Sequence, residues 1–179
     1  GSCSVSCKLE NNLPNDVWYC TVNTVGGAGK DCPGGSYGAN TIAYQPLRCQ
    51  HCENPACVAV CPTGATYKDD MGRVEIDYDK CIGCRMCMAA CPYNARWINP
   101  ETKVADNCDF CLHSKNLAAG ELPGCVAHCR FHALSFGDLN DPNSFVSKLL
   151  KAKDTVRIRP WLGTEPTLRY IPVVKTGVR

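Results

Sequence analysis

The sequence predicts an α+β fold made of small units, each built from short hairpins, cysteine-bearing loops and short helices, followed by an extended carboxyl-terminal tail. The 179 residues include 16 cysteines, about twice the density at which cysteine content becomes informative. These cysteines recur in runs of similar spacing, which is typical of an internally repeated structure. Aromatic residues make up only 8% and the mean hydropathy is −0.20, so the polypeptide alone can build little apolar core.

The most regular run has the spacing Cys-x2-Cys-x2-Cys-x3-Cys-Pro, and it is formed by Cys81, Cys84, Cys87, Cys91 and Pro92. Its first three thiolates lie within seven residues and can bind three corners of one cubane iron–sulfur cluster. The fourth cysteine of such a run, followed by proline, is directed at a second cluster. The run therefore predicts two neighbouring clusters.

Three further runs repeat this pattern with changes. One has four residues between its second and third cysteines, and it consists of Cys49, Cys52, Cys57, Cys61 and Pro62. Another has a long gap between two pairs, which are Cys108 with Cys111 and Cys125 with Cys129. At the amino end, Cys3 and Cys7 have the spacing of the last two cysteines of a run. We expect the first two cysteines of that run to lie upstream of Gly1.

Disulfides and zinc are the alternative explanations for so many cysteines. Close Cys-x2-Cys neighbours seldom bridge each other without strain, so a disulfide framework gives no reason to repeat that spacing. Paired Cys-x2-Cys motifs also build four-thiolate zinc sites, but zinc has no use for the third close cysteine of a run. Iron–sulfur clusters explain the spacing best.

Secondary structure is expected between and after the runs. Residues 65–68 and 73–77 alternate enough to predict two short strands, and residues 69–72 predict the turn of this hairpin. Gly83 permits the positive φ that a loop needs in order to direct its N–H groups at cluster sulfurs. Asp141 and Pro142 predict the start of a short packing helix. Its apolar stripe would consist of Phe145, Val146, Leu149 and Leu150.

Three segments begin with cysteine and end with alanine, namely 61–65, 91–95 and 129–133. Their similarity indicates that one structural unit has been copied, although the third segment lacks the proline. Beyond residue 154, prolines interrupt regular structure and predict an extended tail that wraps a permanent partner. These prolines are Pro160, Pro166 and Pro172.

Basic residues predominate at the carboxyl end, where Lys148, Lys151, Lys153, Arg157, Arg159, Arg169, Lys175 and Arg179 face only Asp154 and Glu165. A solvated face or a docking surface for an acidic partner would explain them. No recognition element for nucleic acid accompanies them, so nucleic-acid binding is not expected. No stretch approaches about 18 consecutive apolar residues, and a direct membrane span is not expected either. The sequence has no nucleotide-binding glycine fingerprint and no recognisable nucleophile, which predicts that the chain is not catalytic by itself.

The chain resembles the four-cluster, ferredoxin-like electron-transfer (beta) subunits of molybdopterin oxidoreductases, such as dimethyl sulfoxide, polysulfide, thiosulfate and arsenate reductases. The order of the cysteine runs carries the resemblance. It extends over nearly the whole chain through residues 7–14, 48–57, 107–111, 136–142 and 163–166. The resemblance implies tandem bacterial-ferredoxin-like units. One would span residues 46–104 and another residues 1–45 plus 105–153, with a partner-wrapping tail at 154–179.

In that family each run lends its last cysteine to its partner run, which implies four [4Fe-4S] clusters here. The resemblance gives one cluster to Cys49, Cys52, Cys57 and Cys91. It gives the next to Cys81, Cys84, Cys87 and Cys61. A third would be bound by Cys108, Cys111, Cys125 and Cys7. The fourth would be bound by Cys3 and Cys129 together with two upstream ligands, one of them immediately before Gly1.

The resemblance also implies a function and two partners. The chain would relay single electrons between a membrane quinone-binding anchor and a molybdopterin catalytic subunit of a respiratory oxidoreductase. It would be held at the cytoplasmic membrane through a partner, on the extracytoplasmic face. The alternatives are a free soluble polyferredoxin that serves several enzymes and a zinc-stabilised interaction module.

Cys20 and Cys32 belong to no run. They could replace missing ligands of the fourth cluster, form a mutual disulfide in an oxidising compartment, or be incidental thiols. Of the four histidines, His51 lies between Cys49 and Cys52. We expect it to shape the surroundings of a cluster and the local electric field rather than to bind iron.

Overall fold

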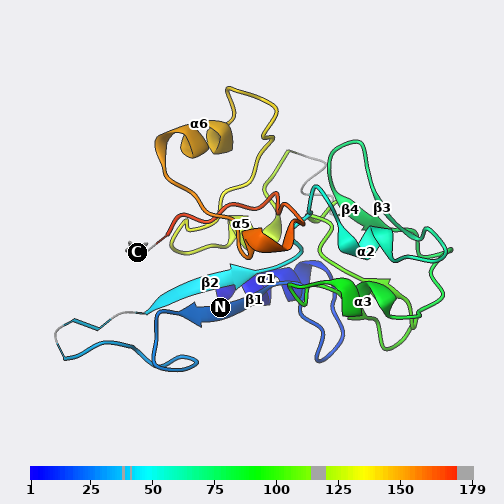
Figure 1. Ribbon diagram of the computed structural model, residues 1–179, viewed down its shortest axis with the longest axis horizontal. Helices are drawn as coiled ribbons and strands as arrows, with labels where there is room; N and C mark the ends of the chain where they lie inside the picture. The colour runs from blue at the N-terminus through cyan, green and yellow to red at the C-terminus, as the bar shows by residue number, and fades with distance from the viewer. Residues whose placement is uncertain (38, 41, 114–119, 173–179) are drawn as a thin grey trace.

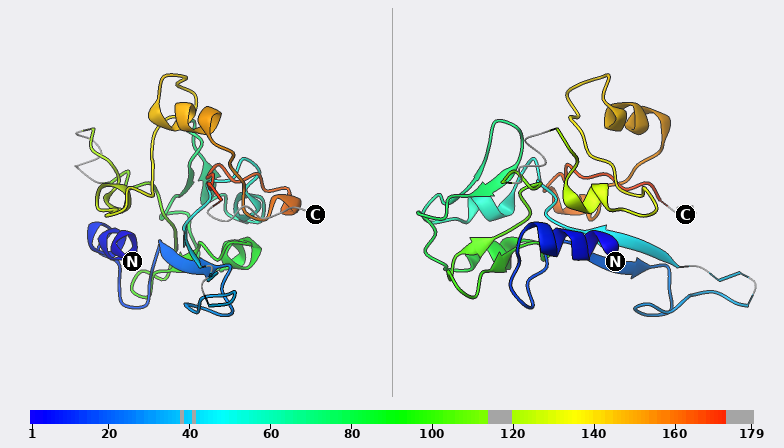
Figure 2. Two further views of the ribbon diagram at one scale, coloured as in Figure 1. Left: turned by 90° about the vertical axis from the view of Figure 1, so that its left-hand side faces the viewer. Right: turned by 180° about the vertical axis from the view of Figure 1, so that it is seen from behind.

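The structure is a computed structural model that describes residues 1–37, 39–40, 42–113 and 120–172. The described residues form short helices and three separate two-stranded sheets, joined by long loops (Figure 1). This small mixed architecture agrees with the predicted α+β class. Residues 49–106 gather at one end of the molecule, and residues 26–37 project at the opposite end (Figure 2).

The hairpin that was predicted in the region 65–77 is confirmed. Strands β3 (Thr66–Lys68) and β4 (Val74–Ile76) pair antiparallel. The Asp69 carboxylate accepts hydrogen bonds from the N–H groups of Met71 and Arg73, at 3.1 and 2.7 Å. Gly72 completes the turn with a φ of +80°, a conformation that glycine adopts without steric cost.

The two other hairpins were not predicted. Strands β1 (Thr21–Val25) and β2 (Ala43–Leu47) pair antiparallel, with Val22 opposite Pro46. Proline lacks an N–H donor and is tolerated because β2 has a partner on one side only. Strands β5 (Trp97–Ile98) and β6 (Ala105–Asp106) form the third pair. The sequence of these strands carries too little alternation over too few residues for a prediction.

The helices are short, and most of them contain a cysteine of one of the runs. These are α1 (Ser2–Glu10), α2 (Ala56–Ala59), α3 (Met86–Ala90) and α5 (Gly124–Ala127). Helices α1 and α5 pack against each other although they are far apart in the sequence. The Ser6 hydroxyl joins them by donating a hydrogen bond of 2.9 Å to the carbonyl oxygen of Gly124.

Helix α6 (Phe145–Ala152) stands apart from the other helices (Figure 1). The prediction that it begins at Asp141 and Pro142 is wrong by a few residues. Ser144 is the N-cap residue, and its hydroxyl accepts a hydrogen bond of 3.2 Å from the N–H group of Ser147. A serine oxygen satisfies one of the free N–H groups of the first turn, whereas residues 141–144 form a preceding turn. The first residue of the apolar stripe, Phe145, is largely exposed.

The chain after α6 returns to the body of the molecule. It contains a bridge between Val156 and Tyr170 and a 3-10 helix, η1 (Pro160–Leu162). Residues 164–167 lie against residues 50–54, with three backbone N–H···O hydrogen bonds of 2.9 to 3.1 Å between the two segments. The described part of the tail therefore packs on its own chain. Its expected contact with a partner stays a prediction, and residues 173–179 lie outside the described part.

Cysteine side chains make up much of the buried core. The main cluster of buried residues contains Cys7, Cys20, Cys49, Cys108 and Cys125, together with Val17, Tyr19, Tyr93, Ala95 and Val126. Thiols and small side chains bury little apolar area, so little hydrophobic stabilisation is available from this core. The fold is arranged around its sulfur atoms.

Candidate iron–sulfur sites

Four cysteines from two different runs line one hollow, which we call site A. They are Cys49, Cys52, Cys57 and Cys91. The hollow contains about 350 Å³ of space that no atom fills, part of it open to solvent. Helix α2 carries Cys57, and Cys91 directly follows α3. Since these two helices pack side by side, a cysteine from one run faces three cysteines of another.

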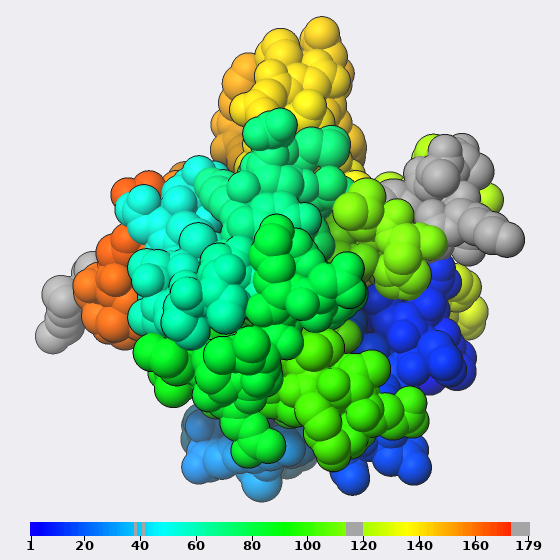
Figure 3. Space-filling model, turned by 90° about the vertical axis from the view of Figure 1, so that its right-hand side faces the viewer, coloured from blue at the N-terminus to red at the C-terminus, as the bar shows by residue number. Residues whose placement is uncertain are grey.

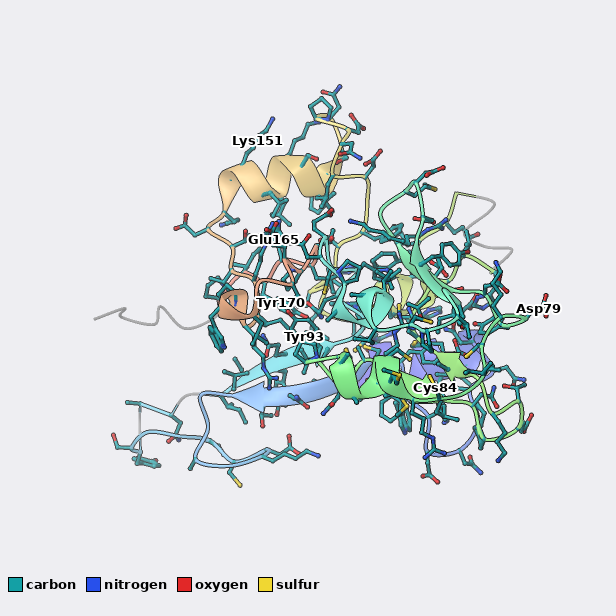
Figure 4. All side chains as sticks on the ribbon, turned by 45° about the vertical axis from the view of Figure 1, so that its right-hand side comes forward. Asp79, Cys84, Tyr93, Lys151, Glu165 and Tyr170 are labelled. Carbon is teal, nitrogen blue, oxygen red and sulfur yellow. The ribbon has the colours of Figure 1, made fainter. Side chains whose placement is uncertain are left out.

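A second hollow, site B, is lined by Cys61, Cys81, Cys84 and Cys87. Its unfilled space is about 290 Å³, again partly open. Backbone N–H groups point at two of these sulfurs, Thr66 N at Cys61 Sγ and Ala105 N at Cys81 Sγ, both at 3.4 Å. Cys84 is exposed and lies beside α3 (Figure 4). Site B therefore reaches the surface, on the face formed by residues 49–105 (Figure 3).

The chain turns back at site B through an unusual backbone conformation. Gly83 has a φ of +67°, as the predicted loop requires. A Cβ atom at this position would meet the carbonyl oxygen of Lys103 at 2.3 Å. Glycine is needed here both for its φ and because the backbone of the β5–β6 connection approaches closely.

The residues around both hollows fit an iron–sulfur cluster. Among the described residues that line them, sulfur is the abundant metal-binding atom and carboxylates are absent. The charged residues in the linings are Arg96 at site A and Arg85 at site B. Thiolates surrounded by N–H donors and cations match the ligands and surroundings that such clusters use. Within the described residues, no three His, Cys, Asp or Glu side chains are close enough together to bind a single metal ion.

A third group of cysteines, site C, consists of Cys7, Cys108, Cys111 and Cys125. All four are buried. The Asn11 amide lies near two of the sulfurs, with its Nδ2 atom 3.7 Å from Cys7 Sγ and 3.9 Å from Cys111 Sγ. The pKa of Cys7 rises to about 12 because burial and the nearby thiolates of Cys125 and Cys111 disfavour its charge. Site C thus brings together cysteines of the first and last runs.

Cys3, one expected ligand of the fourth cluster, lies on helix α1, and Cys129, the other, lies two residues after the end of helix α5, which packs against α1. We call this incomplete set site D. The N–H group of Ala133 donates to Cys129 Sγ at 3.2 Å. The half-buried Cys3 thiol interacts with the buried thiol of Cys20, and the hydrogen bond from Cys20 contributes most to lowering the pKa of Cys3 to about 5.

Cys20 and Cys32 do not form the disulfide that the sequence left as one alternative. Both are free thiols. Cys20 is buried directly before β1, whereas Cys32 is exposed in the connection beyond the other end of that strand. The position of Cys20 beside Cys3 agrees with the alternative that relates it to the fourth cluster.

Burial keeps several site thiols protonated in the metal-free chain. It raises the pKa of Cys49 to about 12 and that of Cys52 to about 11. Cys61 differs: burial is the largest single effect and raises its pKa, but hydrogen bonds from the N–H groups of Thr66, Thr63 and Ala65 and from the Thr63 hydroxyl together outweigh burial and lower the pKa to about 7. Because a metal ligand must be a thiolate, cluster insertion has to release protons, most strongly at the buried sites.

His51 lies between the cysteines of site A and those of site C. Its ring stacks on Phe110 with centroids 3.9 Å apart, and Phe110 lies between Cys108 and Cys111 in the sequence. The N–H group of Val74 donates to His51 Nδ1 at 3.0 Å, so this nitrogen is engaged. Burial lowers the pKa of His51 to about 3 and keeps the ring neutral at physiological pH.

Sequence analysis missed three polar residues next to the cysteines. Arg48 and Arg96 donate hydrogen bonds to cysteine sulfurs. Thr164 lines site A and its hydroxyl lies 2.5 Å from that of Tyr93. Arg48 and Thr164 lie in segments 48–57 and 163–166, which carry the family resemblance. The resemblance assigned no role to either residue.

The comparisons with known proteins agree with this arrangement. A family model described as a 4Fe-4S dicluster domain matches residues 40–139. The chain belongs to this family. It is 46% identical to a putative dimethyl sulfoxide reductase iron–sulfur subunit of Halobacterium salinarum, in an alignment that covers 95% of this chain and 73% of the relative. It is 42% identical to a polysulfide reductase polypeptide of Wolinella succinogenes, over 99% of this chain and 90% of the relative.

A further relative, the thiosulfate reductase electron transfer subunit PhsB of Salmonella typhi, is 43% identical over 78% of this chain and 70% of its own length. The 4Fe-4S family model and these relatives confirm the family resemblance found in the sequence. No helix in the described residues has the length and apolar character needed to cross a membrane.

Proposed function

We propose that this chain is an iron–sulfur electron-transfer subunit, which relays single electrons between a membrane quinone-binding anchor and a molybdopterin catalytic subunit of a respiratory oxidoreductase. The observation that carries the proposal is the grouping of cysteines from different runs around sites A and B. Membership of the 4Fe-4S dicluster family and the named reductase subunits among its relatives support it. When bound, the clusters would supply reversible one-electron chemistry.

In this proposal the cysteine quartets of sites A, B and C each hold one [4Fe-4S] cluster. Cys3 and Cys129 hold part of a fourth at site D. Residues 46–104 then form one ferredoxin-like unit with sites A and B. Residues 1–45 and 105–153 form the other unit, with sites C and D. The tail, 154–179, covers site A in its described part and would meet a partner beyond it.

Contacts between the sites support a linear order of D, C, A and B. Cys3 and Cys7 share helix α1, so D would lie next to C. The stack of His51 on Phe110 joins the loop of site A to that of site C. Helices α2 and α3 pack together, so A would lie next to B. The rate of electron tunnelling between redox centres falls steeply with distance, so the chain has to hold its centres close together. It also has to bring the last centre to the surface, and the exposed Cys84 would do so at site B.

Partners distinguish this proposal from the alternative of a free soluble polyferredoxin. We expect the chain, purified anaerobically from its native membranes after mild detergent extraction, to elute with a molybdenum-containing large subunit and a hydrophobic anchor. Oxidation of a quinol by the complex should then reduce its iron–sulfur signals. Elution as a lone soluble monomer that carries iron would favour the polyferredoxin. A protein that carries zinc without iron would contradict both. Protease protection in sealed vesicles would test the proposed location on the extracytoplasmic face.

A further inference from the structure

The side chain of Arg96 is buried between sites A and B. The residue is only 3% exposed. Its Nη2 atom donates a hydrogen bond of 3.3 Å to the sulfur of Cys57, a cysteine of site A. Its Nη1 atom lies 3.4 Å from the hydroxyl oxygen of Thr66. One guanidinium group thus faces a sulfur on one side and a hydroxyl on the other.

Thr66 extends this contact to site B. Its N–H group donates to Cys61 Sγ at 3.4 Å, and the residue lines the hollow of site B. The path Cys57, Arg96, Thr66, Cys61 therefore connects sulfur atoms of the two sites through one side chain and one further residue. The hydrogen bond to site A is direct, whereas the connection to site B passes through Thr66.

Arg96 has no carboxylate partner among the ion pairs of the described residues. The carboxylate of Glu75 interacts electrostatically with Arg96, but the ion pair that it forms, at 3.8 Å, is with Arg73. A buried charge is costly unless an opposite charge compensates it. Burial opposes the charge of Arg96, yet Cys57, Cys49 and Cys87, in the thiolate form that cluster binding requires, outweigh burial and raise its pKa. The thiolate ligands of sites A and B, on either side of Arg96, compensate its positive charge.

Arg48 repeats this arrangement at site C. Its Nη1 atom donates a hydrogen bond of 3.0 Å to Cys125 Sγ. Its Nε atom is buried and has no hydrogen-bond partner in the described part of the chain. Arg48 directly precedes Cys49 of site A, so this cation also lies near two sites. It provides a matched variant that acts at a different site.

We propose that Arg96 is a positioning residue that raises the reduction potential of the cluster at site A, and to a smaller extent that of the cluster at site B. The inference rests on the proposed function, because it requires clusters at both sites. Reduction adds one negative charge to a site, and a fixed cation nearby stabilises the added charge. A direct charge-assisted N–H···S bond acts more strongly than a contact through Thr66. Arginine keeps its charge at every physiological pH.

The test is a redox titration of the purified complex, followed by electron paramagnetic resonance, with Arg96→Gln and Arg96→Lys. The signals of sites A and B are assigned from Cys52→Ser and Cys84→Ser. We expect Arg96→Gln to lower the equilibrium constant for reduction of the site A cluster about tenfold or more. For one electron this lowers its reduction potential by about 59 mV. The shift at site B should be smaller. Arg96→Lys keeps the charge and should shift site A less than Arg96→Gln does.

Three controls separate this effect from loss of net charge and from misfolding. Lys151→Gln removes an exposed positive charge on α6 and should leave both potentials unchanged. Arg48→Gln should act mainly on site C. Iron content is measured for every variant.

Full iron content with unchanged potentials in Arg96→Gln would overturn the inference, as would a larger shift at site B than at site A. Loss of iron from site A in both Arg96 variants would show a purely structural role and also overturn it. A wild-type complex without iron signals would overturn the proposed function itself.

Discussion

Replacing Cys91 with serine tests the exchange of ligands between the cysteine runs. Cys91 follows α3 in the same run as Cys81, Cys84 and Cys87, yet it lines the hollow of site A. Serine fits the same space but its hydroxyl does not ionise near neutral pH, so it is a poor iron ligand. We expect Cys91→Ser to lose the cluster of site A, about four iron atoms per chain, and to leave site B unchanged.

Cys61→Ser is the matched control, because Cys61 also precedes a proline but lines site B. The assay is iron and acid-labile sulfide per chain, with spectra of the reduced protein. Double variants remove the need to assign signals. Cys52→Ser with Cys91→Ser should lose no more iron than either change alone, whereas Cys84→Ser with Cys91→Ser should lose about eight atoms. The opposite result for the two pairs would refute the assignment.

Three further predictions concern stability. Removal of iron should abolish cooperative thermal unfolding, measured by circular dichroism, because cysteines dominate the core. Asn107→Ala removes hydrogen bonds of 3.0 and 2.7 Å to the carbonyl oxygens of Val74 and Cys108, which should lower the free energy of unfolding by about 2 kcal/mol. Bleaching of the visible absorbance in urea should therefore be faster in this variant. The control Asn143→Ala, at an exposed position, should bleach at the wild-type rate. Burial raises the pKa of Glu75 from 4.5 to about 7, so the folded chain holds a proton that the unfolded chain releases, and stability falls as pH rises through that window. Glu75→Gln should reduce this fall by about 1–2 kcal/mol; an identical pH profile of bleaching in both proteins would contradict the reasoning.

The elements that could be predicted from the sequence are those whose pattern is local. The hairpin of β3 and β4 follows from short alternating strands and a turn with Asp69 and Gly72, and each of these signals acts within a few residues. The positive φ of Gly83 follows from the loop that it has to form. The grouping of the cysteines could be predicted only because the spacing restricts which cysteines share a cluster and the family resemblance supplied the pairing.

The elements that escaped prediction depend on contacts between distant segments. Arg48 and Arg96 are charged, and charged residues are normally expected at the surface. In the structure both donate hydrogen bonds to cysteine sulfurs that are distant in the sequence. The pairing of β1 with β2 bridges a long connection and includes Pro46, which argues against a strand when it is considered alone. The first residue of α6 was missed because Ser144 outcompetes Asp141 as the cap.

The closure of site A by Thr164 bears on how the protein is made. Residues 164–167 leave the ribosome long after residues 49–96, since synthesis proceeds from the amino end. Until that segment arrives, the hydroxyl of Tyr93 and the backbone of residues 50–54 lack the partners that they have in the finished fold. The lining that Thr164 gives to site A is therefore completed only after all four cysteines of that site have been made.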